Sequence, residues 1–387
     1  MQSCRSHLIF LSCHFLLFFT FTGSLQLILS QIMKIIFKKR LLALVCILTF
    51  FTIISWSENN NSDIIGSGEQ PQVSVDKQGV IRVVFGQKDE IFCVTSLDNG
   101  NTFSDPVLVA KVPQMHLGMG RGPQIASSDN FSIITAMDQE GNIRWFRLEN
   151  SSKDWKKMST VNDVNRSAPE GLMSIAADQN DHFYAVWLDT RTGKKNQIYF
   201  SSLSKNENHW SPNILTYQSP DGHVCECCKP SIAVQRSQVA IMFRNWLNGS
   251  RDLYLLRSTN NGKSFMPVQK LGMDTWKLNG CPMDVGSVAF NASNFVQTVW
   301  QRQGSIFYCE PGKREVKVGE GRIPGVAEIS GNTLITMQSR DTVKMVSLTN
   351  NKETIVGKGS FLKSIALQDS KLLCVWQQDN TIKFKRF

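Results

Sequence analysis

The sequence has few charged residues: Asp, Glu, Lys and Arg make up 19% of its 387 residues, against 42% hydrophobic residues. A disordered chain would have fewer apolar residues and a larger net charge, so this composition excludes one. With only 26 glycines the chain is no collagen, and its composition excludes a coiled-coil rod as well. The length fits two ordinary domains or one large all-β or α/β unit.

Half of the formal net charge of +10 lies in residues 1–57. Residues 1–57 contain five basic residues and no acidic one, which leaves 37 Lys and Arg against 32 Asp and Glu in the remainder. That remainder has no basic run of the kind that nucleic-acid binders carry. We therefore expect no nucleic-acid partner.

An export signal is predicted at residues 33–57. Basic residues follow Met33, an apolar segment extends from Leu41 to Ile54, and Ser55-Trp56-Ser57 forms a small-x-small cleavage site. Residues 1–32 are a further apolar extension, either an over-extended start or a real membrane anchor. Under both interpretations the protein is exported (periplasmic, cell-surface or secreted), and only an uncleaved N-terminal segment would contact a membrane.

Residues 58–387 repeat one unit seven times. Each unit has an apolar strand that ends in Trp, Phe or Met, with a short strand on either side and, in six units, a fourth strand. The strand endings are Val83-Val84-Phe85, Thr135-Ala136-Met137, Ala185-Val186-Trp187, Ile241-Met242-Phe243, Thr298-Val299-Trp300, Ile335-Thr336-Met337 and Cys374-Val375-Trp376. Such units are typical of β-propeller blades. The sequence therefore predicts an all-β, single-domain propeller of four-stranded blades, which we expect to be a monomer; a β-sandwich would not explain the recurrence.

The seventh unit ends at Phe387 without its outer strand, which would leave an unpaired sheet edge. The segment from Ser62 to Gly68 precedes the first blade and can supply that strand. We name the strands A to D from the axis outward. An N-terminal D strand would close a ring of seven blades, with six as the alternative.

Two turns between strands C and D share a pattern. Ser96-Leu97-Asp98-Asn99-Gly100-Asn101-Thr102-Phe103 and Ser258-Thr259-Asn260-Asn261-Gly262-Lys263-Ser264-Phe265 both fit the Asp box, in which Asp or Asn accepts turn amides and Gly allows a positive φ. At these residues the chain resembles the sialidase superfamily of Asp-box (BNR-repeat) propellers, over about residues 70–387. The Cys225-Glu226-Cys227-Cys228 run resembles an exported bacterial branch of it.

In a blade of alternating strands, the D-to-A and B-to-C connections emerge on one face, which we call the top face. Arginines that we expect there are candidates for binding a carboxylate, because guanidinium groups donate paired hydrogen bonds. They are Arg121, Arg191, Arg244, Arg251 and Arg322. The alternative is that they form salt bridges between blades.

The resemblance implies, for a true sialidase, an exo-acting glycoside hydrolase with a Tyr nucleophile, an assisting Glu and an Asp acid/base. Glu170 and Asp189 are the acid/base candidates on the top face. Arg322-Ile323-Pro324 matches a family tripeptide but lies in the sixth unit. The five tyrosines lie in or next to predicted strands, so whether the protein is an enzyme stays open.

Four cysteines precede strand A in two adjacent units: Cys225, Cys227, Cys228 and Cys281. Outside the cytoplasm we expect at least one disulfide, such as Cys281 with Cys227 or Cys228. A thiolate site for copper or zinc is the alternative. Cys93, Cys309 and Cys374 lie in predicted strands and fit core positions.

The sequence leads to two functional hypotheses. The first is a sialidase-like propeller that recognises, or also hydrolyses, an anionic glycan or glycoconjugate through an arginine-rich top-face pocket. The second is a non-catalytic metal-binding or protein-interaction propeller centred on Cys225, Cys227, Cys228 and Cys281.

Overall fold

The structure is a computed structural model that describes residues 33–34, 38–39, 63–193, 195–284 and 286–387. The predicted extension at 1–32 and most of the predicted signal at 33–57 lie outside the described residues. Within the described ranges, no helix has the length and apolar character needed to cross a membrane.

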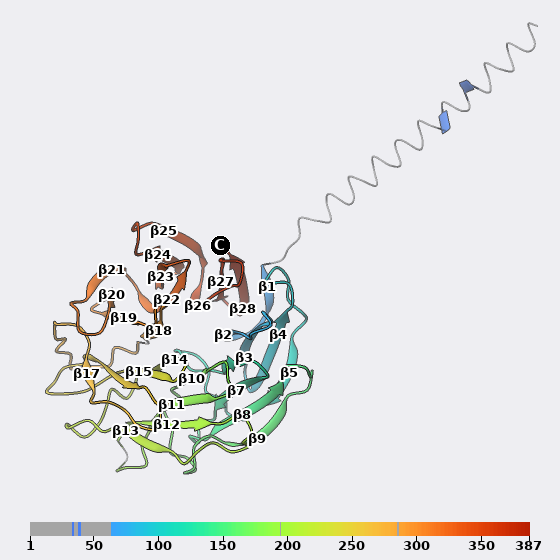
Figure 1. The fold of residues 1–387 in the computed structure, drawn as a ribbon. Coiled ribbons are helices and arrows are strands. Elements are labelled where there is room, and N and C mark those ends of the chain that lie inside the picture. Colours follow the sequence, from blue (N-terminus) through green and yellow to red (C-terminus); the bar gives the residue numbers. More distant parts are fainter. Residues whose placement is uncertain (1–32, 35–37, 40–62, 194, 285) are drawn as a thin grey trace, which may run out of the picture. The chain divides into compact units, whose positions relative to one another are not determined.

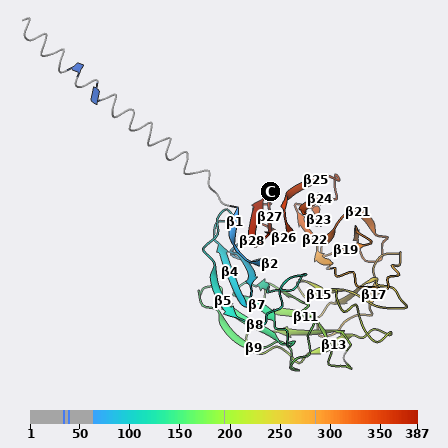
Figure 2. The ribbon, with the colours of Figure 1, turned by 180° about the vertical axis from the view of Figure 1, so that it is seen from behind.

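Residues 63–387 fold into seven antiparallel sheets of four strands each, which follow one another around an axis (Figure 1 and, from behind, Figure 2). The all-β propeller with seven blades is therefore confirmed. Blades 1 to 3 consist of β2 (Glu69–Val75), β3 (Ile81–Gln87), β4 (Glu90–Ser96), β5 (Val107–Lys111), β6 (Gln124–Ser127), β7 (Phe131–Met137), β8 (Ile143–Glu149), β9 (Lys156–Thr160), β10 (Met173–Ala177), β11 (Phe183–Asp189), β12 (Gln197–Leu203) and β13 (Ile214–Tyr217).

Blades 4 to 6 continue the same A-to-D order. They consist of β14 (Ser231–Gln235), β15 (Gln238–Arg244), β16 (Leu253–Ser258), β17 (Gln269–Lys270), β18 (Ser287–Phe290), β19 (Val296–Arg302), β20 (Ser305–Cys309), β21 (Val316–Glu320), β22 (Arg322–Ile329), β23 (Asn332–Ser339), β24 (Thr342–Ser347) and β25 (Glu353–Lys358). Blade 7 combines β26 (Ser360–Ala366), β27 (Leu372–Gln378) and β28 (Thr381–Arg386) with β1 (Ile64–Ser67).

The hydrophobic core is divided among the blade interfaces. Seven buried clusters occur in the described residues, and each joins side chains of two neighbouring blades. The large side chains that end the B strands, such as Trp187 and Phe243, are buried in these clusters. This burial explains why the strand ending recurs: each blade needs a bulky apolar side chain to pack against the next sheet.

β1 closes the ring. It pairs antiparallel with β28, with Ser67 opposite Thr381, and so covers the sheet edge that the seventh unit leaves open. Ile65 is 7% exposed and packs in the cluster between blades 7 and 1. The A strands also contact one another around the whole ring, including β26 with β2. The predicted closure by residues 62–68 is confirmed.

The two patterned C-to-D turns have the hydrogen bonds that their residues predict. Asp98 Oδ1 accepts from the backbone amides of Asn101 (3.0 Å) and Thr102 (2.9 Å). Asn260 Oδ1 accepts from the Ser264 amide in the same way (3.0 Å). These turns lie on the face opposite the D-to-A connections.

We expect Ile65→Ala to lower the free energy of unfolding by about 2–5 kcal/mol, because it removes buried methyl groups from the closing joint. Ile355→Ala, in the D strand of blade 6 where the side chain is 65% exposed, is the matched control and should change it by less than about 0.5 kcal/mol. Urea unfolding of both variants measures the difference, and equal effects would contradict a closing role for β1.

Candidate functional site

The axis of the ring contains a polar channel. A cavity of about 210 Å³ is lined by residues from the A strands of all seven blades or from the connections that lead into them. Its polar lining consists of Gln72, Gln124, Ser174, Lys229, Ser231, Ser287, Thr336, Lys363 and Ser364. No described residue of the lining is Asp or Glu. The channel therefore offers hydroxyl, amide and ammonium groups without a carboxylate.

Strand register places one lysine in this channel. Lys363 of β26 lies opposite Val375, as Ser174 lies opposite Val186 and Ser231 opposite Met242. Other blades have a small or neutral polar residue at this position, and blade 7 has a lysine. No described residue pairs with the Lys363 ammonium group.

The second lysine enters from the connection between β13 and β14. Lys229 reaches from blade 4 to blade 2, where its Nζ donates to Gln124 Oε1 (2.5 Å). Burial and the nearby Lys363 charge lower the pKa of Lys229 well below its usual value. Burial also lowers the pKa of Lys363, to about 8. Two ammonium groups without a counter-charge are costly in a channel, and a bound anion would relieve that cost.

Asp189, an acid/base candidate, is fully buried at the end of β11. Its Oδ1 accepts from the Arg191 amide and Nε (both 2.9 Å), and its Oδ2 accepts from Arg191 Nη2 (2.8 Å). Oδ2 also accepts from Ser167 Oγ (2.7 Å) and Trp187 Nε1 (2.8 Å). Five donors hold this carboxylate in place, and three of them belong to Arg191, which favours a structural role for both residues.

The second acid/base candidate, Glu170, pairs with Arg121. The Arg121 Nε donates to the Glu170 carbonyl oxygen (2.6 Å), and the two charged groups lie 3.7 Å apart. The Glu170 side chain is 35% exposed, so it is accessible at the top face. Arg322 is exposed at the start of β22.

Arg244 and Arg251 lie together under the top face of blade 4. Arg244 is 3% exposed and donates to the carbonyl oxygens of Arg251 (2.7 Å) and Gln301 (2.8 Å). Arg251 donates to the Cys225 sulfur atom (3.0 Å) and lies over the Trp246 ring, 4.6 Å from its centre. The structure thus brings two predicted arginines to the cysteines and pairs Arg121 and Arg191 with acidic neighbours.

Among the described residues, no tyrosine is paired with a glutamate at the mouth of the channel. Tyr308 donates to Glu310 (3.5 Å), and burial together with the Glu310 charge raises its pKa to about 12. This pair lies where strand C of blade 5 ends, on the face opposite the D-to-A connections. Tyr217, at the end of β13, instead accepts from Asn245 Nδ2 (2.9 Å).

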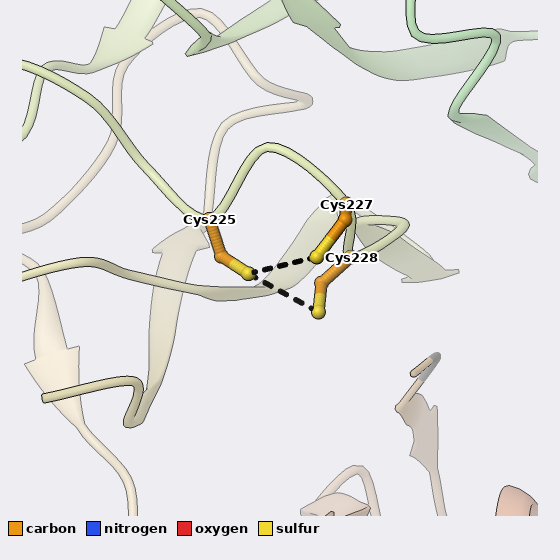
Figure 3. Close-up of side chains that lie close together, drawn as sticks. All are labelled: Cys225, Cys227 and Cys228. Atoms are coloured by element: carbon orange, nitrogen blue, oxygen red, sulfur yellow. Dashed lines mark hydrogen bonds between the residues drawn. The ribbon is translucent and has the colours of Figure 1, made fainter. Parts of the chain in front are cut away.

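The cysteines gather at the two predicted connections. A disulfide joins Cys227 to Cys281, which is one of the two pairings that the sequence predicts. The Cys225 sulfur atom lies 3.2 Å from that of Cys228 and 3.7 Å from that of Cys227, and Figure 3 shows the three side chains pointing toward one another. These three sulfur atoms all lie within 4.8 Å of one another, which is close enough to hold one metal ion.

The surroundings shift the pKa values of the two free thiols of this cluster, Cys225 and Cys228, in opposite directions. The hydrogen bond between Cys225 and Cys228 and the charges of Arg251 and Arg244 lower the pKa of Cys225 to about 6, against the effect of its burial. Burial raises the pKa of Cys228 well above its usual value. The strand cysteines Cys93, Cys309 and Cys374 are buried, as expected of core residues.

A larger cavity, about 800 Å³, lies at the A-to-B turns of blades 1 to 4. Four of its charged or titratable groups form pairs, Lys77 with Asp129 (2.8 Å) and His182 with Asp178 (2.9 Å), and Arg236 also lines it. This cavity therefore has a mixed lining of acidic and basic groups, whereas the described lining of the channel has basic groups and no carboxylate.

Comparison with known proteins identifies the fold. No protein-family model and no curated protein sequence matches the chain. Among solved structures it is similar to the BP39L lectin from Burkholderia pseudomallei, at 11% identity and a TM-score of 0.56, over 82% of this chain and 98% of the lectin. The six-bladed fucose-binding Aleuria aurantia lectin gives 8% identity and a TM-score of 0.51, over 76% and 96%. At these identities, the likeness supports the propeller fold, and membership of the sialidase superfamily stays a prediction.

An enzyme gives a third comparison. An ulvan lyase of a polysaccharide lyase family, bound to -[GlcA(1-4)Rha3S]-, matches at 10% identity and a TM-score of 0.51, over 83% of this chain and 94% of the lyase. The fold is therefore found both in proteins named as lectins and in a carbohydrate-cleaving enzyme.

We expect Asp189→Ala to lower the free energy of unfolding by about 2–4 kcal/mol, because it leaves the Ser167 hydroxyl and the Trp187 indole N–H without an acceptor and removes the buried partner of Arg191, which keeps Asp163 and Asn213. Glu170→Ala, which removes a more exposed ion pair, should cost less than about 1 kcal/mol. Urea unfolding compares them. A loss below 1 kcal/mol for Asp189→Ala would show that the group is not needed for the fold and would restore it as a catalytic candidate.

Proposed function

We propose that this protein is a carbohydrate-recognition propeller that binds an anionic glycan or glycoconjugate at the top-face mouth of the axial channel. The observation that carries the proposal is the pair of lysines, Lys229 and Lys363, in a channel whose described lining has no carboxylate. A carboxylate or sulfate group on a sugar would supply the missing negative charge.

The channel lining suits such a ligand chemically. Ammonium groups form charge-assisted hydrogen bonds with carboxylate and sulfate oxygens. The serine hydroxyls and glutamine amides beside them can donate to and accept from sugar hydroxyls. A cavity of about 210 Å³ has room for the charged end of a sugar, with the rest of the glycan lying across the top face.

The comparisons support a carbohydrate as the ligand. Two of the similar propellers are lectins, and the ulvan lyase was solved with a ligand that contains a uronic acid. Binding sites in one fold differ in their residues, so the anionic charge is argued from Lys229 and Lys363 and not from these proteins.

Binding is favoured over hydrolysis. A hydrolase of the predicted type needs a Tyr–Glu pair and an accessible acid/base near the bound sugar. Asp189 is buried among five donors and the Tyr308–Glu310 pair lies on the opposite face, which leaves Glu170 as the accessible candidate. The exposed Arg322 and the Glu170-bound Arg121 are the predicted arginines with access to a glycan that lies on the top face.

A glycan array that holds uronate, sialic-acid, sulfated and neutral sugars tests the proposal. We expect the purified protein to bind acidic glycans, and Lys363→Met to weaken this binding about 10- to 100-fold because a charge-assisted hydrogen bond is lost. Lys371→Met, at an exposed lysine of the same blade, is the matched control and should bind normally. Selective binding of neutral glycans, or equal binding by both variants, would refute the site.

The affinity should also fall as the pH rises. An anion binds the protonated lysine, and the pKa of Lys363 in the free protein is about 8. The charged fraction of a group with this pKa decreases about tenfold between pH 7 and pH 9, so the affinity should decrease by a similar factor. Isothermal titration at several pH values measures this slope, and Lys363→Met should flatten it. An unchanged affinity up to pH 9 would exclude Lys363 as the anion's partner.

A further inference from the structure

The cysteine cluster is a second site, built from two connections that the ring brings together. Cys225, Cys227 and Cys228 precede β14, and Cys281 precedes β18 in the next blade. The Cys227–Cys281 disulfide joins the two connections, and the remaining two thiols lie directly behind it. Three sulfur atoms from one connection therefore meet a fourth from a residue 54 positions after Cys227.

The spacing of the sulfur atoms matches a thiolate metal site. Zn–S bonds are about 2.3 Å long, so two ligands of a tetrahedral zinc ion lie about 3.8 Å apart. Cys225 lies 3.7 Å from Cys227 and 3.2 Å from Cys228, measured between sulfur atoms. Little movement of the three side chains would be needed to surround one ion.

The surroundings suit an anionic metal–thiolate centre. Cys225 is fully buried and Cys228 is 3% exposed, so several thiolates here would need nearby positive charge. Arg251 donates to the Cys225 sulfur atom (3.0 Å), and its own charge is only partly offset by Glu226 at 3.3 Å. Because Arg251 is packed against the Trp246 ring, it would stay in place when an ion enters.

The disulfide sets the condition for binding. While Cys227 is bonded to Cys281, both sulfur atoms are unavailable as thiolates. The Cys281 residue is exposed, so a dithiol reductant can reach the bond. Exchange with that dithiol breaks the Cys227–Cys281 bond, leaves two protein thiols and converts the reductant to a disulfide. The cluster then has four potential thiolate ligands.

We propose that Cys225, Cys227, Cys228 and Cys281 form a redox-gated site for a thiophilic ion, Cu(I) or Zn(II), which is closed by the Cys227–Cys281 disulfide and opened by its reduction. All-sulfur ligand sets select these ions over magnesium, calcium or manganese. Ion binding releases the thiol protons to solvent and requires no change in the oxidation state of the metal. The site is independent of the glycan site, which is assayed with the disulfide intact.

The test compares the same purified protein in two redox states. One portion is reduced with a phosphine and desalted under nitrogen, and the other keeps its disulfide, which mass spectrometry verifies. Each is titrated with Cu(I) in competition with bathocuproine disulfonate, and with Zn(II) in competition with a coloured indicator. We expect one tightly bound ion per reduced chain and at least 100-fold weaker binding by the oxidised chain. Tight binding of only one of the two metals identifies the ion and supports the site.

Variants locate the ion. Cys225→Ser and Cys228→Ser should each weaken binding by reduced protein at least tenfold, whereas Cys374→Ala, at a buried cysteine in β27, should not. Thermal melting shows which variants are folded. For the unaltered protein, X-ray absorption should show a sulfur-only first shell, at about 2.3 Å for zinc. Equal binding in both redox states, oxygen or nitrogen as the main ligands, or an equal loss in Cys374→Ala would overturn the proposal.

Discussion

The structure depends on the packing of each blade against the next. In the part of the chain that the structure describes, all seven apolar clusters lie between blades and none lies within one blade, so the fold is complete only when the last interface forms. β1 makes that interface possible, because it pairs with β28 and places Ile65 between blades 7 and 1. This constraint also explains the channel: a closed ring must bring one strand from each blade to the axis.

A closed ring of blades can place a charged side chain in an axial channel, which a single sheet does not have. The channel position that is Ser174 in blade 3 and Ser231 in blade 4 is Lys363 in blade 7, where the side chain is half-buried among the A strands. The cost of that burial is distributed over a fold with many other contacts. Binding sites commonly contain groups that destabilise the free protein and that the bound ligand stabilises.

The fold was predictable from the sequence because its determinants are local and repeat. The strand ending at Trp187 or Phe243 recurs in every blade, and the missing D strand identifies the segment around Ile65. The site was less predictable, because the partners of Arg244, such as Gln301, lie far away in sequence. Lys363 was missed, although an alignment of the seven A strands would have shown a lysine where other blades have small or polar residues.

Ion pairing distinguishes the charges that stabilise the fold from the one that we propose binds a ligand. The charges of Asp189 and Arg191 satisfy each other in the interior, so evolution of a ligand site there would have to break a network on which the fold relies. Lys363 is half-buried and has no described counter-ion, and it lies in the lining of the channel. A carboxylate within the channel would have stabilised the free protein. None lies in the described lining, and for this reason we propose the channel, and not the arginines of the top face, as the place where a charged sugar binds.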